Sequence, residues 1–141
     1  MKFMIAMPFV DTNILLYRVS LDPGEARKQR IAEEILDRDD LFLSVQVLQE
    51  FVQATRPTRP DALTHREACA LIESWKRFPI LDTSIALVEA ALASKIQWQL
   101  SYWDAAIIEA ARMSGCDTVL SEDLNDGQDY GGVTVRNPFR A

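Results

Sequence analysis

The chain has 141 residues, 48% of them hydrophobic, and a formal net charge of −6. This length and composition predict one globular domain over residues 1–141, and no apolar stretch approaches the roughly 20 residues that a membrane span needs. The negative charge excludes a nucleic-acid binder that relies on a broad basic surface, and it favours a basic protein partner.

Cysteine and glycine usage narrows the class of protein further. The two cysteines, Cys69 and Cys116, cannot form a disulfide framework, so we expect reduced packing residues and a cytoplasmic protein. The five glycines form neither a dinucleotide-binding pattern nor a phosphate-binding loop. This excludes the common nucleotide-cofactor enzymes.

Short apolar runs alternate with segments of helical periodicity along the chain. In chain order, the pattern predicts strand Met7–Val10, helix Glu25–Arg38, strand Leu41–Val45, helix Gln46–Thr55, loop Pro57–Pro60, helix Asp61–Arg77, strand Phe78–Leu81, a helix from a cap at Asp82–Ser84 to Trp98, helix Ser101–Gly115, strand Asp117–Ser121, polar loop Glu122–Gln128 and strand Val133–Val135. Strands separated by helices predict an α/β fold, an α/β/α sandwich around a mostly parallel sheet of about five strands. Ligands of such folds bind at the carboxyl ends of the strands.

Two acidic residues follow predicted strands at that edge of the sheet. Asp11 comes directly after the first strand, and Asp123 lies just beyond the strand that ends near Ser121. A third acid, Glu50, lies about one turn into the helix after the second strand. It shares a helical face with Val47 and Ala54, so we expect its carboxylate to face inward.

Asp104 is the most informative single acid. Residues three, four and seven positions later in its predicted helix are Ile107, Ile108 and Ala111, so Asp104 lies on an apolar face. An unpaired carboxylate is costly in such a place, and a bound metal ion would offset the cost.

Each acid also has an ordinary structural interpretation. Asp11 could be a helix N-cap, Asp123 a turn residue, and Asp104 the third residue of a capping box that begins at Ser101. Glu50 could be a solvated helix residue. Four such acids in one small domain nevertheless favour one site, because carboxylates are the ligands that Mg²⁺ and Mn²⁺ prefer. Such ions activate water and orient phosphodiesters.

Four short segments of the chain resemble the acidic motifs of PIN-domain ribonucleases, in order and spacing across nearly the whole sequence. They are Val10-Asp11-Thr12-Asn13, Gln49-Glu50-Phe51, Tyr102-Trp103-Asp104-Ala105 and Ser121-Glu122-Asp123-Leu124. The stretch Ser121–Gly127 is particularly similar to one branch of the bacterial VapC-type toxins of toxin–antitoxin pairs.

The resemblance implies a PIN-like fold and Mg²⁺- or Mn²⁺-dependent endonucleolytic cleavage of RNA by a metal-activated water. By position, it implies catalytic and metal-binding acids at Asp11, Glu50, Asp104 and Asp123. It further implies that Thr12 and Asn13 support Asp11, that Ser121 positions Asp123, and that Asp126 is an extra acid at the rim. It also implies a homodimer, inhibited by a small antitoxin that places a segment across the site.

Other residues carry weaker signals. Arg27, Lys28 and Arg30 form a basic strip, and Arg56, Arg59 and Arg66 form a second; both are typical of solvated faces, with phosphate contact along RNA as the functional alternative. The single histidine, His65, does not favour a histidine-based nuclease. Trp103 is expected in the core or an interface.

Two other functions stay open. A Mg²⁺-dependent phosphatase or phosphotransferase on a similar sheet would place a second acid two residues after Asp11, where this chain has Asn13. A non-catalytic PIN-like interaction domain would need no complete set of acids.

Overall fold

Five parallel strands form the centre of the part of the chain that the computed structural model describes, which is residues 7–55 and 63–140. The strands are β1 (Pro8–Val10), β2 (Leu43–Ser44), β3 (Ile80–Leu81), β4 (Thr118–Leu120) and β5 (Thr134–Arg136). They form a sheet of order β1-β4-β5 and a two-stranded sheet of β2 and β3. The β1–β4, β4–β5 and β2–β3 pairs are all parallel.

A single parallel bridge between Phe9 and Phe42 joins the two sheets. Val10 N donates to Phe42 O at 2.9 Å and Phe42 N donates to Pro8 O at 3.0 Å, so the strands follow one another in the order β3-β2-β1-β4-β5. The predicted α/β fold with a parallel sheet of about five strands is therefore confirmed.

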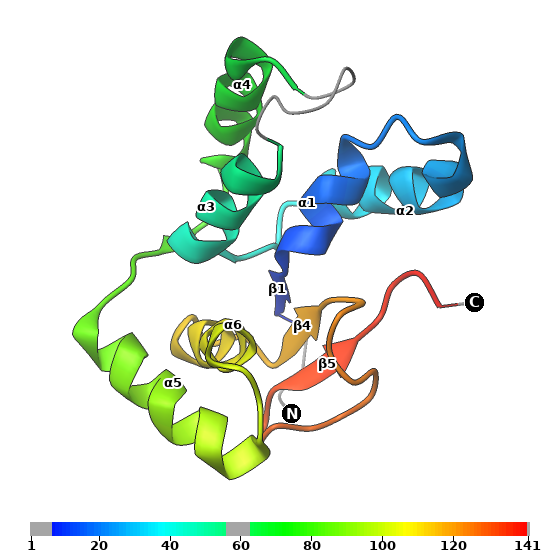
Figure 1. Ribbon diagram of the computed structural model, residues 1–141. Coiled ribbons are helices and arrows are strands. Elements are labelled where there is room, and N and C mark those ends of the chain that lie inside the picture. The colour runs from blue at the N-terminus through cyan, green and yellow to red at the C-terminus, as the bar shows by residue number, and fades with distance from the viewer. Residues whose placement is uncertain (1–6, 56–62, 141) are drawn as a thin grey trace, which may run out of the picture.

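The helices form two groups around these strands. They are α1 (Thr12–Arg18), the short 3₁₀ helix η1 (Pro23–Glu25), α2 (Ala26–Leu36), α3 (Val45–Ala54), α4 (His65–Trp75), α5 (Ile85–Trp98) and α6 (Tyr102–Met113). Helix α5 packs along α6, whereas α1 packs against α2 and α3. Figure 1 shows the α5–α6 pair and the α1–α2 pair on opposite sides of β1 and β4.

Helix α1 is the one α-helix of the described residues that the sequence pattern did not predict; the short η1 was not predicted either. Its apolar residues form a continuous run from Ile14 to Tyr17, without the spacing of an amphipathic helix. The structure explains the run, because Ile14 and Leu15 are fully buried between the strands and the neighbouring helices. Asp11 is the N-cap of α1 and accepts a hydrogen bond from Thr12 N, so its interpretation as a helix cap is confirmed.

Two other expectations change in detail. Helix α4 begins at His65 after the N-cap Thr64, which forms a capping box with Glu67; the predicted cap Asp61 and loop Pro57–Pro60 lie outside the described residues. Cys69 is exposed, so its prediction as a packing residue is wrong. Cys116 is buried, and burial raises the pKa of its thiol to about 12.

The core lies between the strands and both helix groups. Phe9, Val119 and Val135 are fully buried on neighbouring strands. Phe51 of α3 meets Trp75 of α4 edge to face, with ring centroids 4.9 Å apart. None of the described helices is long and apolar enough to span a bilayer.

Candidate acidic active site

The site begins where β1 and β4 end side by side. The two strands pair in parallel, with Val10 opposite Leu120, and Asp11 N donates to Leu120 O at 3.0 Å. The residues that follow each strand therefore start from the same edge of the sheet. This brings Asp11 close to Ser121 and Asp123, although about 110 residues separate them in sequence.

Asp11 is the buried centre of the site, with only 7% of its surface exposed. Its carboxylate accepts hydrogen bonds from Ser121 Oγ at 2.8 Å and from Thr12 N at 2.7 Å. The pKa of Asp11 is raised to about 6, mainly by burial and to a smaller extent by the nearby charges of Asp123 and Glu50, while the two hydrogen bonds lower it. Asp11 is thus a carboxylate that gains from a neighbouring positive charge.

Asn13 connects Asp11 to Asp123. Its Nδ2 lies 3.2 Å from Asp123 Oδ2, 3.2 Å from Ser121 Oγ and 3.5 Å from Asp11 Oδ2. Its Oδ1 accepts a hydrogen bond from Glu122 N at 3.4 Å. An amide can do both because it carries a donor and an acceptor, whereas an aspartate here would add a third like charge.

Glu50 approaches the same site from α3. Its Oε1 accepts a hydrogen bond from Thr12 Oγ1 at 2.9 Å, and its side chain is half-buried. The expected inward direction of Glu50 is therefore observed. The side chain of Thr12 contacts Glu50, and only its backbone N–H contacts Asp11.

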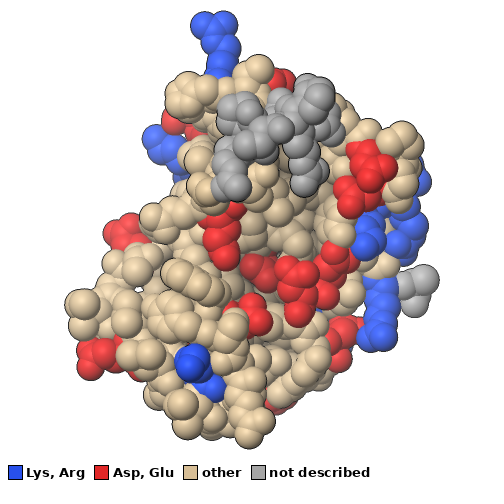
Figure 2. All heavy atoms as spheres, viewed as in Figure 1, with Lys and Arg blue, Asp and Glu red and all other residues tan. Residues whose placement is uncertain are grey.

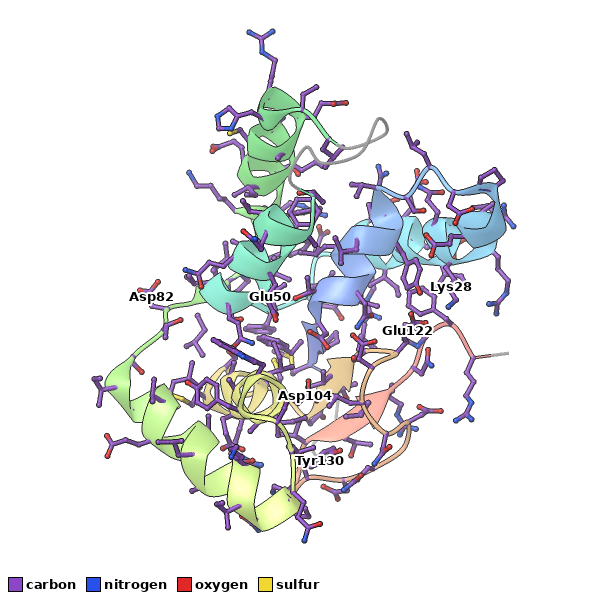
Figure 3. All side chains as sticks on the ribbon, in the orientation of Figure 1. Lys28, Glu50, Asp82, Asp104, Glu122 and Tyr130 are labelled. Atoms are coloured by element: carbon purple, nitrogen blue, oxygen red, sulfur yellow. The ribbon has the colours of Figure 1, made fainter. Side chains whose placement is uncertain are left out.

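Asp104 lies in the first turn of α6, where Ser101 Oγ accepts from its backbone N–H at 3.1 Å. The ordinary interpretation as the third residue after an N-cap is thus correct for the backbone. The side chain is half-buried, and its charge helps burial to raise the pKa of Tyr130. Figure 3 shows Asp104 beside α6, on the side of β4 and below Glu50.

Acidic side chains gather at the centre of the face drawn in Figure 2, over the region where α1, α3 and α6 meet in Figure 1. Among residues 7–55 and 63–140, no three acidic, histidine or cysteine side chains converge tightly enough to form a ready-made cation site. The candidate ligand atoms are nonetheless carboxylate and hydroxyl oxygens around a buried acid that repels its neighbours. This donor set fits a hard divalent cation such as Mg²⁺ or Mn²⁺.

Asp126 has partners of its own. Its Oδ1 accepts from Asn137 N at 2.8 Å and its Oδ2 pairs with Arg140 at 3.1 Å. These two contacts hold the pKa of Asp126 below its usual range. The carboxylate is thus engaged by the C-terminal segment, and its place at the rim of the site stays a prediction.

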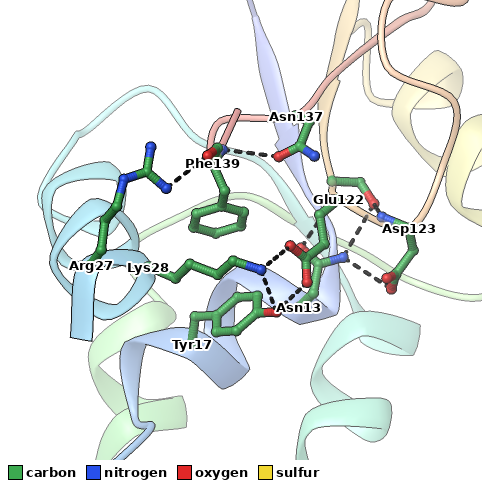
Figure 4. A network of polar contacts seen from close by, with 9 residues as sticks. Asn13, Tyr17, Arg27, Lys28, Glu122, Asp123, Asn137 and Phe139 are labelled. Carbon is green, nitrogen blue, oxygen red and sulfur yellow. Dashed lines mark hydrogen bonds and ion pairs between the residues drawn. The ribbon is translucent and has the colours of Figure 1, made fainter. Parts of the chain in front are cut away.

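A polar network beside the acids was missed from the sequence. Glu122 accepts hydrogen bonds from Lys28 Nζ, at 2.8 Å, and from Tyr17 Oη (Figure 4). Burial raises the pKa of Glu122, but the bonds from Lys28 and Tyr17 outweigh it and hold the pKa below its usual range. Lys28 was visible only as part of a basic strip, because its partner lies 94 positions away. In the second strip, Arg56 and Arg59 lie outside the described residues.

The family model described as "PIN domain" matches residues 9–125. No protein in the comparison with curated proteins matches the chain.

Solved structures of bacterial proteins share the fold at low sequence identity. A toxin–antitoxin complex from Klebsiella pneumoniae superposes with a TM-score of 0.67 at 19% identity, covering 93% of this chain and 97% of the other. VapC20 of Mycobacterium tuberculosis, described as a sarcin-ricin loop cleaving toxin, gives 0.64 at 23% identity and coverages of 92% and 99%. The DNA-bound VapBC of Salmonella typhimurium gives 0.66 at 15% identity and coverages of 95% and 99%.

Proposed function

Because the chain belongs to the PIN domain family, we propose that it is a Mg²⁺- or Mn²⁺-dependent endoribonuclease, the toxin of a toxin–antitoxin pair. One observation carries the proposal. Asp11 is buried, its pKa is raised, and hydrogen bonds through Asn13 and Ser121 connect it to Asp123. A domain without catalysis would gain nothing from gathering repelling acids in this way.

The acidic residues would hold the cation, with Asp11 at the centre and Glu50, Asp104 and Asp123 around it. When bound, the cation supplies an activated water and offsets charge on the phosphodiester. Asn13 and Ser121 orient the carboxylates of Asp11 and Asp123, because each donates to an acidic oxygen. Thr12 directs Glu50 by donating to its Oε1.

RNA as the substrate, and a small antitoxin as the partner, rest on the solved relatives. One similar structure is described as a toxin that cleaves the sarcin-ricin loop, and another is described as a toxin–antitoxin complex. The net charge of −6 is suited to a basic partner segment that lies across the acids. We place the protein in the cytoplasm, where its RNA would be met.

Helix α5 supports the proposal that the protein is a homodimer. Ile85, Leu92 and Ile96 are 75%, 52% and 75% exposed, although all three are large apolar residues of one helix. Their spacing of seven and four positions puts them along one side of α5. Such a row is typical of a surface that a partner covers, and we assign it to a second copy of the chain.

The variant Asp104→Asn tests the function. It removes one negative charge but keeps the shape of the side chain, so we expect RNA cleavage with Mn²⁺ to fall by about a hundredfold or more. Growth arrest on expression should disappear with it. The measurements are cleavage of a pool of cellular RNAs, growth after induction, and the melting temperature, which should stay near that of the wild type.

Asp82→Asn is the matched control, because Asp82 is exposed and lies away from Glu50 and Asp104 in Figure 3. It should cleave RNA as the wild type does. Full cleavage by a folded Asp104→Asn protein would contradict the role of Asp104. A wild type that cuts no RNA with either metal would instead favour a non-catalytic interaction domain.

A further inference from the structure

Glu122 stands between two site residues, Ser121 and Asp123, but its carboxylate is directed away from them. The backbone N–H of Glu122 donates to Asn13 Oδ1 at 3.4 Å, on the side of the acids. Its side chain reaches the other way, to Tyr17 of α1 and Lys28 of α2 (Figure 4). The residue is therefore held from both sides.

Lys28 makes one ion pair and several further contacts. Its Nζ lies 2.8 Å from Glu122 Oε2 and 3.2 Å from Tyr17 Oη. The same ammonium lies 4.8 Å from the centroid of the Tyr17 ring and 5.7 Å from that of Phe139. A lysine with a carboxylate, a hydroxyl and two aromatic rings around its ammonium group has fewer favourable side-chain conformations than a solvated surface lysine.

The C-terminal segment covers this network. Phe139 packs edge to face on Tyr17, with ring centroids 4.9 Å apart, and its carbonyl accepts from Arg27 Nη1 at 2.8 Å. Asn137 supports the segment by accepting from Phe139 N at 2.9 Å. Two members of the predicted basic strip, Arg27 and Lys28, thus have partners within the protein.

The turn that carries Asp123 lies beside a buried acid of like charge. Strand β4 ends at Leu120, and Asp123 is an exposed residue of the loop that follows. The charges of Asp11 and Asp123 repel each other, which favours movement of this loop away from the buried acid. A free Glu122 carboxylate would add a further negative charge beside them.

We propose that Tyr17, Lys28 and Glu122 form a clamp that fixes the turn of residues 121–123, and so positions Asp123 while keeping the Glu122 carboxylate out of the acidic site. The three are positioning residues, since they act on the site through the backbone of the turn. The proposal rests on the proposed nuclease function for its purpose, but its geometry is independent of that function.

The main alternative is that Lys28 contacts RNA phosphate, as its place in a basic strip suggests. The two interpretations differ in what the loss of the charge changes. A phosphate contact acts on RNA binding, and its removal lowers the salt dependence of binding by about one unit of slope. The clamp acts on the protein before RNA or metal binds.

Lys28→Met tests the clamp, because methionine keeps much of the apolar stem and removes the ammonium. Tyr17→Phe is a milder second variant that removes only the hydroxyl and keeps the ring against Phe139. Lys28→Arg should restore the pair. Lys76→Met is the matched control, since it breaks another exposed ion pair, with Glu73 at 3.2 Å, on α4 and its cap.

The first measurement is amide hydrogen exchange by NMR, without metal or RNA. We expect exchange at Glu122 and Asp123 to rise by about tenfold in Lys28→Met and by about threefold in Tyr17→Phe, because opening of the turn becomes easier. Amides of the core strands should be unchanged. Lys28→Arg and Lys76→Met should exchange as the wild type does.

The second measurement is Mn²⁺ affinity by calorimetry, followed by the kinetics of RNA cleavage. Residues that orient ligands typically change metal affinity by about tenfold or more, so Lys28→Met should bind Mn²⁺ about tenfold more weakly. Its kcat should fall while KM for RNA and the salt dependence stay the same.

Two results would overturn the clamp. One is unchanged exchange at Glu122 and Asp123 in both Lys28→Met and Tyr17→Phe. The other is a raised KM and a lower salt slope in Lys28→Met with unchanged exchange and Mn²⁺ affinity, which would make Lys28 a phosphate contact. A wild type that neither binds Mn²⁺ nor cuts RNA would overturn the proposed function alone, because the exchange measurement needs neither.

Discussion

Asp11 illustrates at the scale of one residue how a site can hold an unfavourable charge. The carboxylate is 7% exposed, and two like charges lie nearby. Its pKa of about 6, against 3.8 for an ordinary aspartate, corresponds to about 3 kcal/mol of lost stability when the group is ionised in the folded protein. The hydrogen bonds from Ser121 and Thr12 offset part of this cost but not all of it.

The pH dependence of stability should reveal this cost. Because the folded pKa is above the unfolded one, the folded protein binds the proton more tightly. The stability that the folded protein gains from a protonated Asp11 is complete below about pH 4 and is lost as the pH rises through about 6. In Asp11→Asn this loss is absent, so the melting temperature of the variant relative to the wild type should rise by several degrees between about pH 4.5 and about pH 7.5.

The melting curves are to be measured with a chelator present, and then with Mn²⁺ at about pH 7.5. Mn²⁺ should stabilise the wild type and have a smaller effect on Asp11→Asn, because the cation offsets the charge that the variant lacks. A difference in melting temperature that stays constant across the pH range would contradict the assignment of the raised pKa to Asp11.

At the scale of the elements, the pair of helices α5 and α6 forms the most extensive helix–helix contact of the described fold. Small buried residues allow it, with Ala91 of α5 against Ala105 and Ala106 of α6. Ser94 is the exception on this face. It is 4% exposed, and its Oγ is the one buried side-chain polar atom without a hydrogen-bond partner in residues 7–55 and 63–140.

Two serine-to-alanine variants in and next to α5 should have opposite effects. Ser94→Ala removes a buried hydroxyl without a partner, so the free energy of unfolding should rise by about 1 kcal/mol. Ser84→Ala removes the N-cap whose side chain accepts from Leu87 N, so the same quantity should fall by about 1 kcal/mol. Urea unfolding measures both. A destabilised Ser94→Ala protein would show that its hydroxyl has a partner, such as a buried water.

At the scale of the whole molecule, the acidic site lies where separate segments meet, and the apolar row of α5 lies elsewhere. The proposed site draws on residues of α1, α3 and α6 and on those that follow β1 and β4. The row on α5 takes no part in the hydrogen bonds of the site. A surface that is free of site residues can be covered by a second copy without blocking the acids.

Ile96→Glu should convert the proposed dimer into monomers, because it places a charge within the apolar contact. Sedimentation velocity should give about twice the chain mass of 16.0 kDa for the wild type and a single chain for the variant. Leu21→Glu is the control, since Leu21 is 74% exposed but lies outside α5 and should leave the dimer intact. A wild type that sediments as a monomer at every concentration would contradict the dimer.

The sequence by itself determined the kind of fold and the candidate acids, because both depend on local patterns. Apolar runs followed by polar residues marked β1 and β4, and parallel strands bring their carboxyl ends together, so Asp11 and Asp123 could be placed at one edge in advance. The apolar run of Ile14 to Tyr17 showed no such pattern, because the first residues of α1 are buried on all sides and leave no solvent-exposed face there. Helix α1 was missed for that reason.

Only the tertiary structure decided which side chains form hydrogen bonds or ion pairs with one another. Thr12 contacts Glu50 across 38 positions, Asn13 contacts Asp123 across 110, and Lys28 contacts Glu122 across 94. No local pattern encodes such pairs, since they depend on how the strand order and helix packing place distant segments. The same lysine that the sequence offered as a phosphate contact therefore lies in the structure beside the turn that carries an acid of the site.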